Sequence, residues 1–177
     1  MARYVAFLRA INVGGRVVKM DRLRALFEEL GHANVETFIA SGNVLFDSTS
    51  RSVAAMERKI EAKLASSLGY DVATLVRPIT ALASIVERHA FADVEEEHTI
   101  LVGFLREGPS ATVLARLKAL QTPTDVFHID GAQFYWWCKT RQNESRITNV
   151  MLERAMEGSP VTFRNITTVR KLAAKAG

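Results

Sequence analysis

Short apolar runs alternate with amphipathic stretches through the first half of the chain. Residues 3–9 form an apolar run typical of a strand. Leucine and phenylalanine then recur at i, i+3, i+4 and i+7 within residues 20–31, which predicts a helix that ends at its glycine. Further strands are predicted at 34–40, 44–47 and 71–77, and a second helix at 51–68. The resulting element order is βαββαβ.

The same order of elements returns in the second half. After a connecting helix near 79–90, the pattern predicts a strand at 99–105, a helix at 110–120, a hairpin at 125–138, a helix at 146–157, a strand at 161–164 and a closing helix from Asn165. We therefore expect an α+β protein made of two tandem ferredoxin-like (βαββαβ) halves with mostly antiparallel sheets. The expected halves are residues 1–92 and 93–177.

Several predicted strands are apolar on both faces. In residues 133–138, QFYWWC, aromatic side chains alternate to both sides of the strand. A second apolar face must be covered, because large exposed apolar patches are rare on monomers. Sheet packing between the halves or a homodimer would cover it. A base-stacking platform like that of RNA-recognition modules is the functional alternative, but the strands lack the basic and aromatic signature of such modules.

Composition narrows the class of protein. A chain of 177 residues with 48% hydrophobic residues can bury one or two cores without disulfide or metal support. Cys138 is the single cysteine, and the apolar run at the N-terminus is too short for a secretory signal or a membrane span. The four histidines are not spaced as metal ligands. We expect a cytoplasmic protein with no metal, no cofactor and no membrane partner.

Charge is segregated along the chain, although the net charge is only +4. Residues 1–27 hold six basic residues against one acidic residue, and residues 139–177 hold eight against three. The middle of the chain is therefore net acidic. Two basic ends that meet in space would attract a phosphate-bearing partner, whereas two solvated faces are the simpler explanation.

The stretch between the first strand and the first helix combines glycines with basic residues. Gly14 and Gly15 allow a sharp turn and leave backbone N–H groups uncovered, next to the positive end of the helix dipole. Arg9, Arg16 and Lys19 surround this turn. The combination predicts an anion cradle, but it matches neither the P-loop nor the Rossmann spacing. An ordinary turn, with glycines required by geometry alone, explains the pattern equally well.

A second basic turn precedes the closing helix. Asn165 can cap that helix, while Arg164 adds positive charge where the helix dipole is already positive. A bound anion would relieve this repulsion. We expect the glycine turn and the turn at Arg164 to converge on a shared electropositive hollow.

Three short motifs together resemble the domain of unknown function 1697 family: INVGG at 11–15, SGNV at 41–44, and the closing block of Thr162, Arg164, Asn165, Thr168, Lys171 and Leu172. The chain departs from that family at Ala10, often glycine there, and at Ile166, often tryptophan. The resemblance implies a bacterial, cytosolic α+β protein with duplicated halves, and it supplies no catalytic residues.

Three functions remain open from the sequence. The leading hypothesis is a protein that binds a phosphate-bearing ligand such as a nucleotide or nucleic acid. The second is an enzyme acting on a phosphorylated or carboxylated metabolite, although no catalytic residue or general base is identifiable. The third is a structural or interaction role as a homodimer. The predicted ligand-binding residues are Arg9, Asn12, Gly14, Gly15, Lys19, Ser41, Gly42, Asn43, Arg164, Asn165 and Thr168.

Overall fold

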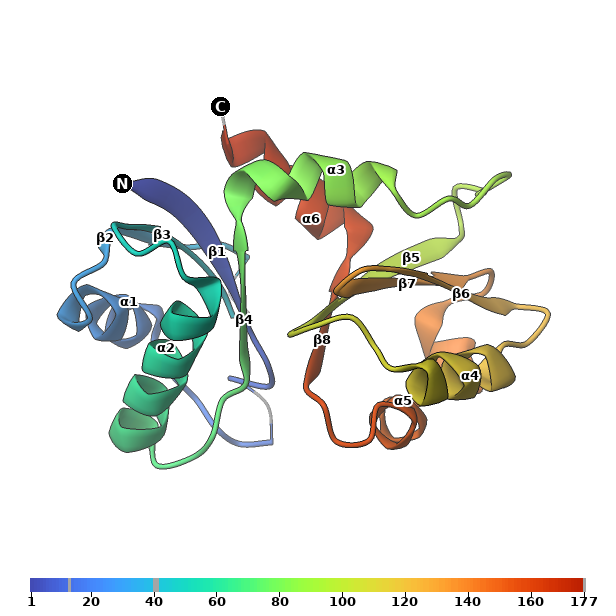
Figure 1. Ribbon diagram of the computed structural model, residues 1–177, viewed down its shortest axis with the longest axis horizontal. Coiled ribbons are helices and arrows are strands. Elements are labelled where there is room, and N and C mark those ends of the chain that lie inside the picture. Colours follow the sequence, from blue (N-terminus) through green and yellow to red (C-terminus); the bar gives the residue numbers. More distant parts are fainter. Residues whose placement is uncertain (13, 40–41, 177) are drawn as a thin grey trace. The chain divides into compact units, whose positions relative to one another are not determined.

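The computed structural model describes residues 1–12, 14–39 and 42–176. The chain divides into two compact units, which we call unit 1 (Met1–Ala81) and unit 2 (Leu82–Lys175). Each unit contains one four-stranded antiparallel sheet, and the described residues form six α-helices in all (Figure 1). The expectation of a mixed α+β protein with antiparallel sheets is confirmed.

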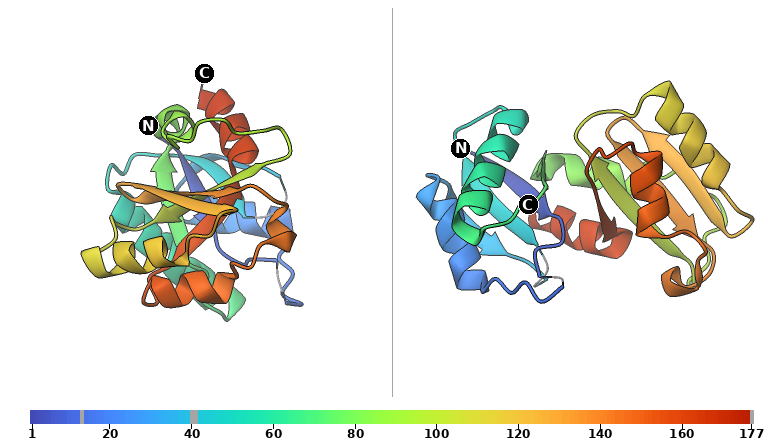
Figure 2. Two further views of the ribbon diagram at one scale, coloured as in Figure 1. Left: turned by 90° about the vertical axis from the view of Figure 1, so that its right-hand side faces the viewer. Right: turned by 90° about the horizontal axis from the view of Figure 1, so that it is seen from below.

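Unit 1 has the predicted element order. Its elements are β1 (Ala2–Leu8), α1 (Met20–Glu29), β2 (Ala33–Thr37), β3 (Asn43–Ser48), α2 (Val53–Leu68), β4 (Thr74–Pro78) and a 3₁₀ turn (Ile79–Ala81). The strands lie in the order β2-β3-β1-β4. Helices α1 and α2 lie side by side on one face of this sheet (Figures 1 and 2).

The core of unit 1 follows from the apolar periodicity of its helices. Leu23, Leu26 and Phe27 form the buried side of α1 and pack with side chains from alternate positions of β1. The local signals for α2 also hold, because Ser52 caps its first turn and Gly69 ends it in a left-handed conformation (φ 81°). The apolar period of α1 and the end signals of α2, both read from the sequence, are therefore found in the structure.

The other face of the sheet in unit 1 is apolar too, as the sequence predicts. Val5, Phe7, Leu45 and Leu75 alternate with the core positions of their strands and are all fully buried. Alternation places these side chains away from α1 and α2.

Unit 2 repeats the strand order of unit 1. Its elements are α3 (Leu82–Glu87), β5 (Thr99–Leu105), α4 (Ala111–Leu120), β6 (Asp125–Asp130), β7 (Gln133–Cys138), a 3₁₀ turn (Gln142–Glu144), α5 (Asn149–Ala155), β8 (Val161–Asn165), α6 (Ile166–Ala173) and a last 3₁₀ turn (Ala174–Ala176). The strands lie in the order β6-β7-β5-β8.

Helices cover both faces of the sheet in unit 2 (Figure 1). Helices α4 and α5 lie against one face, and α3 and α6 lie against the other. The hydroxyl of Tyr135 on β7 donates to the carbonyl of Ile85 on α3 at 2.6 Å, and burial raises the pKa of Tyr135 to about 12. The second aromatic face of β7 is thus covered by helices of its own unit.

Several boundaries differ from the sequence-based expectation. The predicted helix at 79–90 is split into a 3₁₀ turn and the shorter α3, and α3 packs in unit 2 against α6. The division between the units therefore falls after Ala81 instead of after residue 92. The strand expected at 34–40 is shorter in the structure, because β2 stops at Thr37, and the strand expected at 44–47 begins one residue earlier, at Asn43.

Candidate functional site

The connection between β1 and α1 is an exposed loop anchored at both ends. Ile11 and Val18 are buried, whereas Asn12, Gly14 and Gly15 are exposed. The side-chain oxygen of Asn12 accepts the backbone N–H of Val18 at 2.7 Å, which closes the loop. Asn12 therefore has a structural task that explains its presence in the motif.

Tyr70, from the connection between α2 and β4, supports the same loop. Its hydroxyl donates to the carbonyl of Ile11 at 3.3 Å, and the guanidinium of Arg16 lies over its ring, 4.3 Å from the centroid. A guanidinium held on an aromatic face keeps its charge and its edge donors. The sequence indicates Arg16 through the basic cluster, but no local signal connects Tyr70 to it.

The glycine pair lies at the outer side of this loop. Both glycines have positive φ, 67° at Gly14 and 81° at Gly15, and a side chain added to either would meet no atom within 4 Å. The glycines are therefore required by backbone conformation and not by close packing. The space next to them is open to a ligand.

Helix α1 begins without a side-chain cap. Its N-cap residue is Lys19, whose ammonium group has no acceptor atom. The helices α2, α4, α5 and α6 are each capped by a side-chain oxygen, from Ser52, Ser110, Thr148 and Asn165. The first turn of α1 holds one carboxylate, Asp21, and this pairs with Arg24. The N-terminus of α1 therefore presents N–H groups and a lysine to solvent.

Gly42 and Asn43 hold the end of β1 in place. A side-chain carbon on Gly42 would lie 2.8 Å from the carbonyl oxygen of Leu8, and the carbonyl of Gly42 accepts the N–H of Leu8 at 2.7 Å. The buried Asn43 amide donates to the carbonyl of Phe38 at 3.1 Å. These two residues have structural tasks next to the loop, and the predicted site residue Ser41 lies outside the described residues.

Arg9 and Ala10 lead from β1 into the loop. The backbone N–H of Arg9 donates to the carbonyl of Ala73 at 2.9 Å, and the residue is half-buried. Ala10 has a φ of 54°, a conformation that favours glycine. This backbone geometry gives a physical reason for the glycine that the resemblance associates with the position.

The second predicted turn belongs to unit 2. Arg164 donates to the Thr162 hydroxyl at 2.9 Å and to the carbonyl of Phe163 at 2.7 Å, and burial lowers its pKa to about 10. The side-chain oxygen of Asn165 accepts the N–H of Thr167 at 2.9 Å, which is the predicted helix cap. Thr168 is half-buried in the first turn of α6.

A cluster of two carboxylates and one imidazole lies in the connection before β5. Ligand atoms of Glu95, Glu97 and His98 all lie within 4.8 Å of one another. However, Nδ1 of His98 accepts two N–H groups, from the Trp137 indole and the Glu95 backbone, each at 3.1 Å. A neutral imidazole that accepts at Nδ1 carries its proton on Nε2, so it offers no lone pair there to a metal. The bonds give His98 a structural task.

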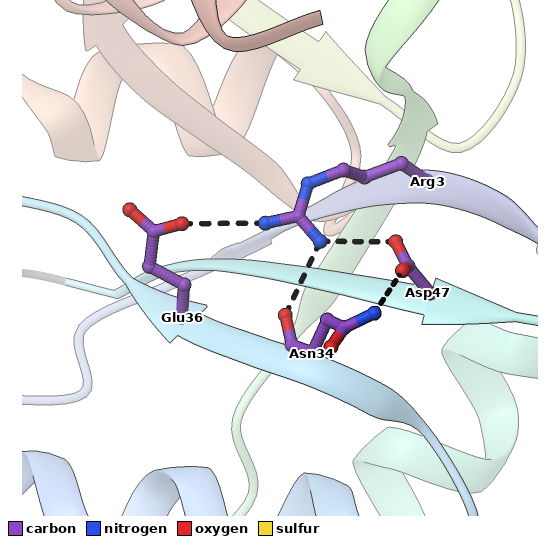
Figure 3. Close-up of polar contacts among 4 residues, drawn as sticks. All are labelled: Arg3, Asn34, Glu36 and Asp47. Carbon is purple, nitrogen blue, oxygen red and sulfur yellow. Dashed lines mark hydrogen bonds and ion pairs between the residues drawn. The ribbon is translucent and has the colours of Figure 1, made fainter.

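A polar network ties the strands of unit 1 together (Figure 3). Arg3 on β1 donates to Asp47 at 2.9 Å, to Glu36 at 3.3 Å and to the carbonyl of Asn34 at 3.2 Å. The Asn34 amide also donates to Asp47 at 2.7 Å, and this bond and Arg3 lower the pKa of the Asp47 carboxyl. The carboxylates of Glu36 and Asp47 both accept hydrogen bonds within the network. We therefore infer that the network fixes the register of β1, β2 and β3.

The comparisons agree with the fold. A solved structure described as that of conserved bacterial protein SP0830 from Streptococcus pneumoniae is similar to this chain, with a TM-score of 0.79 and 24% sequence identity over 99% of each chain. At that identity the similarity shows the shared α+β fold. No match was found among curated proteins. Across the described residues, the helices are all too short or too polar to span a bilayer.

The family is established by the N-terminal three quarters of the chain. A family model described as "Protein of unknown function (DUF1697)" matches residues 1–135. The chain belongs to this family, which confirms the resemblance drawn from the sequence motifs. The matched range includes the INVGG motif at 11–15 and the SGNV motif at 41–44, and the closing block at 162–172 lies beyond it.

Proposed function

We propose that unit 1 binds a phosphate-bearing ligand at the loop between β1 and α1. The observation that supports this most directly is the start of α1 at Lys19, with N–H groups and no side-chain acceptor. An N-terminal side-chain cap contributes about 1 kcal/mol to a typical helix. A phosphate at the same place would accept those N–H groups and interact favourably with the helix dipole.

The neighbouring groups suit an anion. Gly14 and Gly15 add backbone next to open space, and the exposed Arg16 and Lys19 add positive charge. Arg16 is oriented by Tyr70, so its guanidinium loses less freedom on binding than an unsupported side chain would. We base the site on these unit 1 residues, with Arg9 and Asn12 as supports of the loop, and not on Arg164, Asn165 or Thr168.

The test is an NMR titration of the full chain with inorganic phosphate, a panel of nucleoside phosphates and a short single-stranded RNA. We expect amide shifts at Gly14, Gly15 and the first turn of α1. Steep weakening with added salt would indicate the multiple phosphate contacts of a nucleic acid, whereas a shallow dependence would indicate a small ligand. Shifts confined to other parts of the chain would refute the site.

The substitution Lys19→Asp separates binding from stability. The new carboxylate can cap α1 from within, so the melting temperature should rise by the equivalent of about 1 kcal/mol, while phosphate binding weakens about tenfold. Lys59→Asp makes the same charge change at an exposed position of α2 and should leave binding nearly unchanged. Equal loss of binding in both variants would show a general charge effect in place of a site.

We also infer that the two units are ferredoxin-like halves related by duplication. The support is the identical strand order, with the first strand of each unit paired to its third and fourth. The register is matched too, since Val5 pairs with Arg77 in unit 1 and Val102 pairs with Arg164 in unit 2. An arginine thus occupies the same place on the last strand of each sheet.

A further inference from the structure

Unit 2 has an open apolar groove between α4 and α5. The two helices lie side by side on one face of the sheet (Figure 2). The groove has a volume of about 440 Å³. Its lining residues are Arg116, Ala119, Leu120, Met151, Arg154 and Ala155. Four of these are apolar and the other two are arginines, so the groove suits an apolar side chain flanked by carboxylates.

The two charged side chains that line the groove are both arginines. Arg116 and Lys118 are the charged residues of α4, which contains no acidic residue. Arg116 is paired with Glu157 at 2.8 Å, and Arg154 lies exposed in the last turn of α5. Arg154 is therefore the lining cation that an incoming acidic segment would meet.

Unit 2 also contains an exposed acidic segment with one apolar residue. Residues 93–97 read Asp-Val-Glu-Glu-Glu and are all exposed. Val94 is 38% exposed, and it is flanked by carboxylates on both sides. Asp93 has a φ of 59°, a left-handed conformation that turns the backbone sharply just before Val94.

The segment is held away from the groove of its own chain. Phe91 lies against the Trp137 ring, with 5.1 Å between centroids, and the Trp137 indole N–H donates to His98 at 3.1 Å. Both ends are thereby fixed to β7. Figure 1 places the segment on the side of the sheet that α3 and α6 cover, whereas α4 and α5 lie on the opposite side.

We propose that residues 93–97 of one copy dock into the α4–α5 groove of a second copy, with Val94 in the apolar groove and the glutamates next to Arg154 and Arg116. The inference is independent of the phosphate site in unit 1. Because the two contacting surfaces differ, the association is head-to-tail and can continue from copy to copy or close into a ring. The contact is small, so the association is weak, reversible and sensitive to salt.

The test is sedimentation velocity of the full chain from micromolar to millimolar concentration, at low and high salt. We expect concentration-dependent oligomers at low salt that dissociate at high salt. Val94→Ser and Arg154→Glu should each weaken the association by about fivefold or more. Combining Arg154→Glu with Glu96→Arg in one chain should restore it, because both charges are exchanged. Arg58→Glu, on an exposed position of α2, is the control and should have no effect.

Three outcomes would overturn the proposal. A chain that stays monomeric at millimolar concentration and low salt does not use this contact. Association that survives both Val94→Ser and Arg154→Glu must use another surface. A failure of the exchanged pair to restore association would show that Arg154 and Glu96 do not meet. None of these outcomes changes the phosphate titration of unit 1, so the two proposals fail separately.

Discussion

Asp125 is the most heavily hydrogen-bonded carboxylate that the structure describes in unit 2. It begins β6, is 1% exposed, and accepts from the Trp136 indole at 2.9 Å and from the Ser145 hydroxyl at 2.7 Å. The hydroxyls of Thr122 and Thr124 donate to it at 2.8 and 3.2 Å. Burial raises the pKa of Asp125, but these four donors together outweigh it and hold the pKa below the ordinary value.

We predict that Asp125→Ala destabilises unit 2 by about 3 kcal/mol at neutral pH. Hydrogen bonds to a charged acceptor contribute about 1.5–3 kcal/mol, and a stranded buried donor costs about 1–3 kcal/mol. The hydroxyls can find other partners, whereas the Trp136 indole N–H cannot, because that side chain is 1% exposed. Thr124→Ala, at an exposed residue with the longest of the four bonds, should cost less than about 1 kcal/mol.

The pH dependence supplies an independent check. A carboxyl with a folded pKa below its unfolded value of about 3.9 stabilises the fold fully above that value, and the contribution is lost as pH falls through the folded pKa. The stability difference between wild type and Asp125→Ala should therefore be constant from about pH 5 to pH 7 and shrink below about pH 4.

Urea unfolding followed by tryptophan fluorescence measures the effect in the right place, because both tryptophans, Trp136 and Trp137, lie in unit 2. A cost below about 1 kcal/mol at pH 7, or a difference that does not shrink in acid, would refute this account of the network.

Two further substitutions test backbone and packing. Ala10→Gly should raise the stability of unit 1 by about 0.5–1 kcal/mol, because the residue has a φ of 54° and glycine adopts that conformation without strain; calorimetry measures it, and an unchanged or lower melting temperature contradicts it. Gly103→Ala should destabilise unit 2 by about 1–3 kcal/mol, because the new carbon would lie 2.9 Å from ring atoms of Phe134 and Phe163. Tryptophan fluorescence would report that loss, and a stability equal to wild type would show that the rings can move apart.

The strands and most helices were predictable because their signals are local. Ser52 and Gly69 mark the ends of α2 in the sequence, and the apolar run of β1 is long enough to indicate a strand. The split at Ala81 was not predictable. Ile79, Leu82 and Ile85 continue one helical period, and the place where the units divide depends on which sheet each residue packs against.

The candidate site also combines residues that local rules predict with residues that only the fold brings together. Gly14, Gly15 and Lys19 follow from local rules about turns and helix starts. Tyr70 does not, because it is 59 residues away from the Ile11 carbonyl that it supports, and only the fold brings the two together. The exposed valine of the acidic segment likewise reads as an ordinary turn residue until the groove between α4 and α5 is known.

The two units can be compared at the loop that joins the first strand of each sheet to the helix that follows it. In unit 2 this connection runs from Leu105 to the capping Ser110. It lines a cavity of about 420 Å³, to which it contributes Glu107 and to which Glu157 also contributes. In unit 1 the connection is longer, contains the glycine pair, and lacks the cap. A helix that starts without a side-chain cap gives up about 1 kcal/mol relative to a capped one. A ligand that accepts the same N–H groups would offset that loss, which is why the phosphate titration and Lys19→Asp address the most informative position in unit 1.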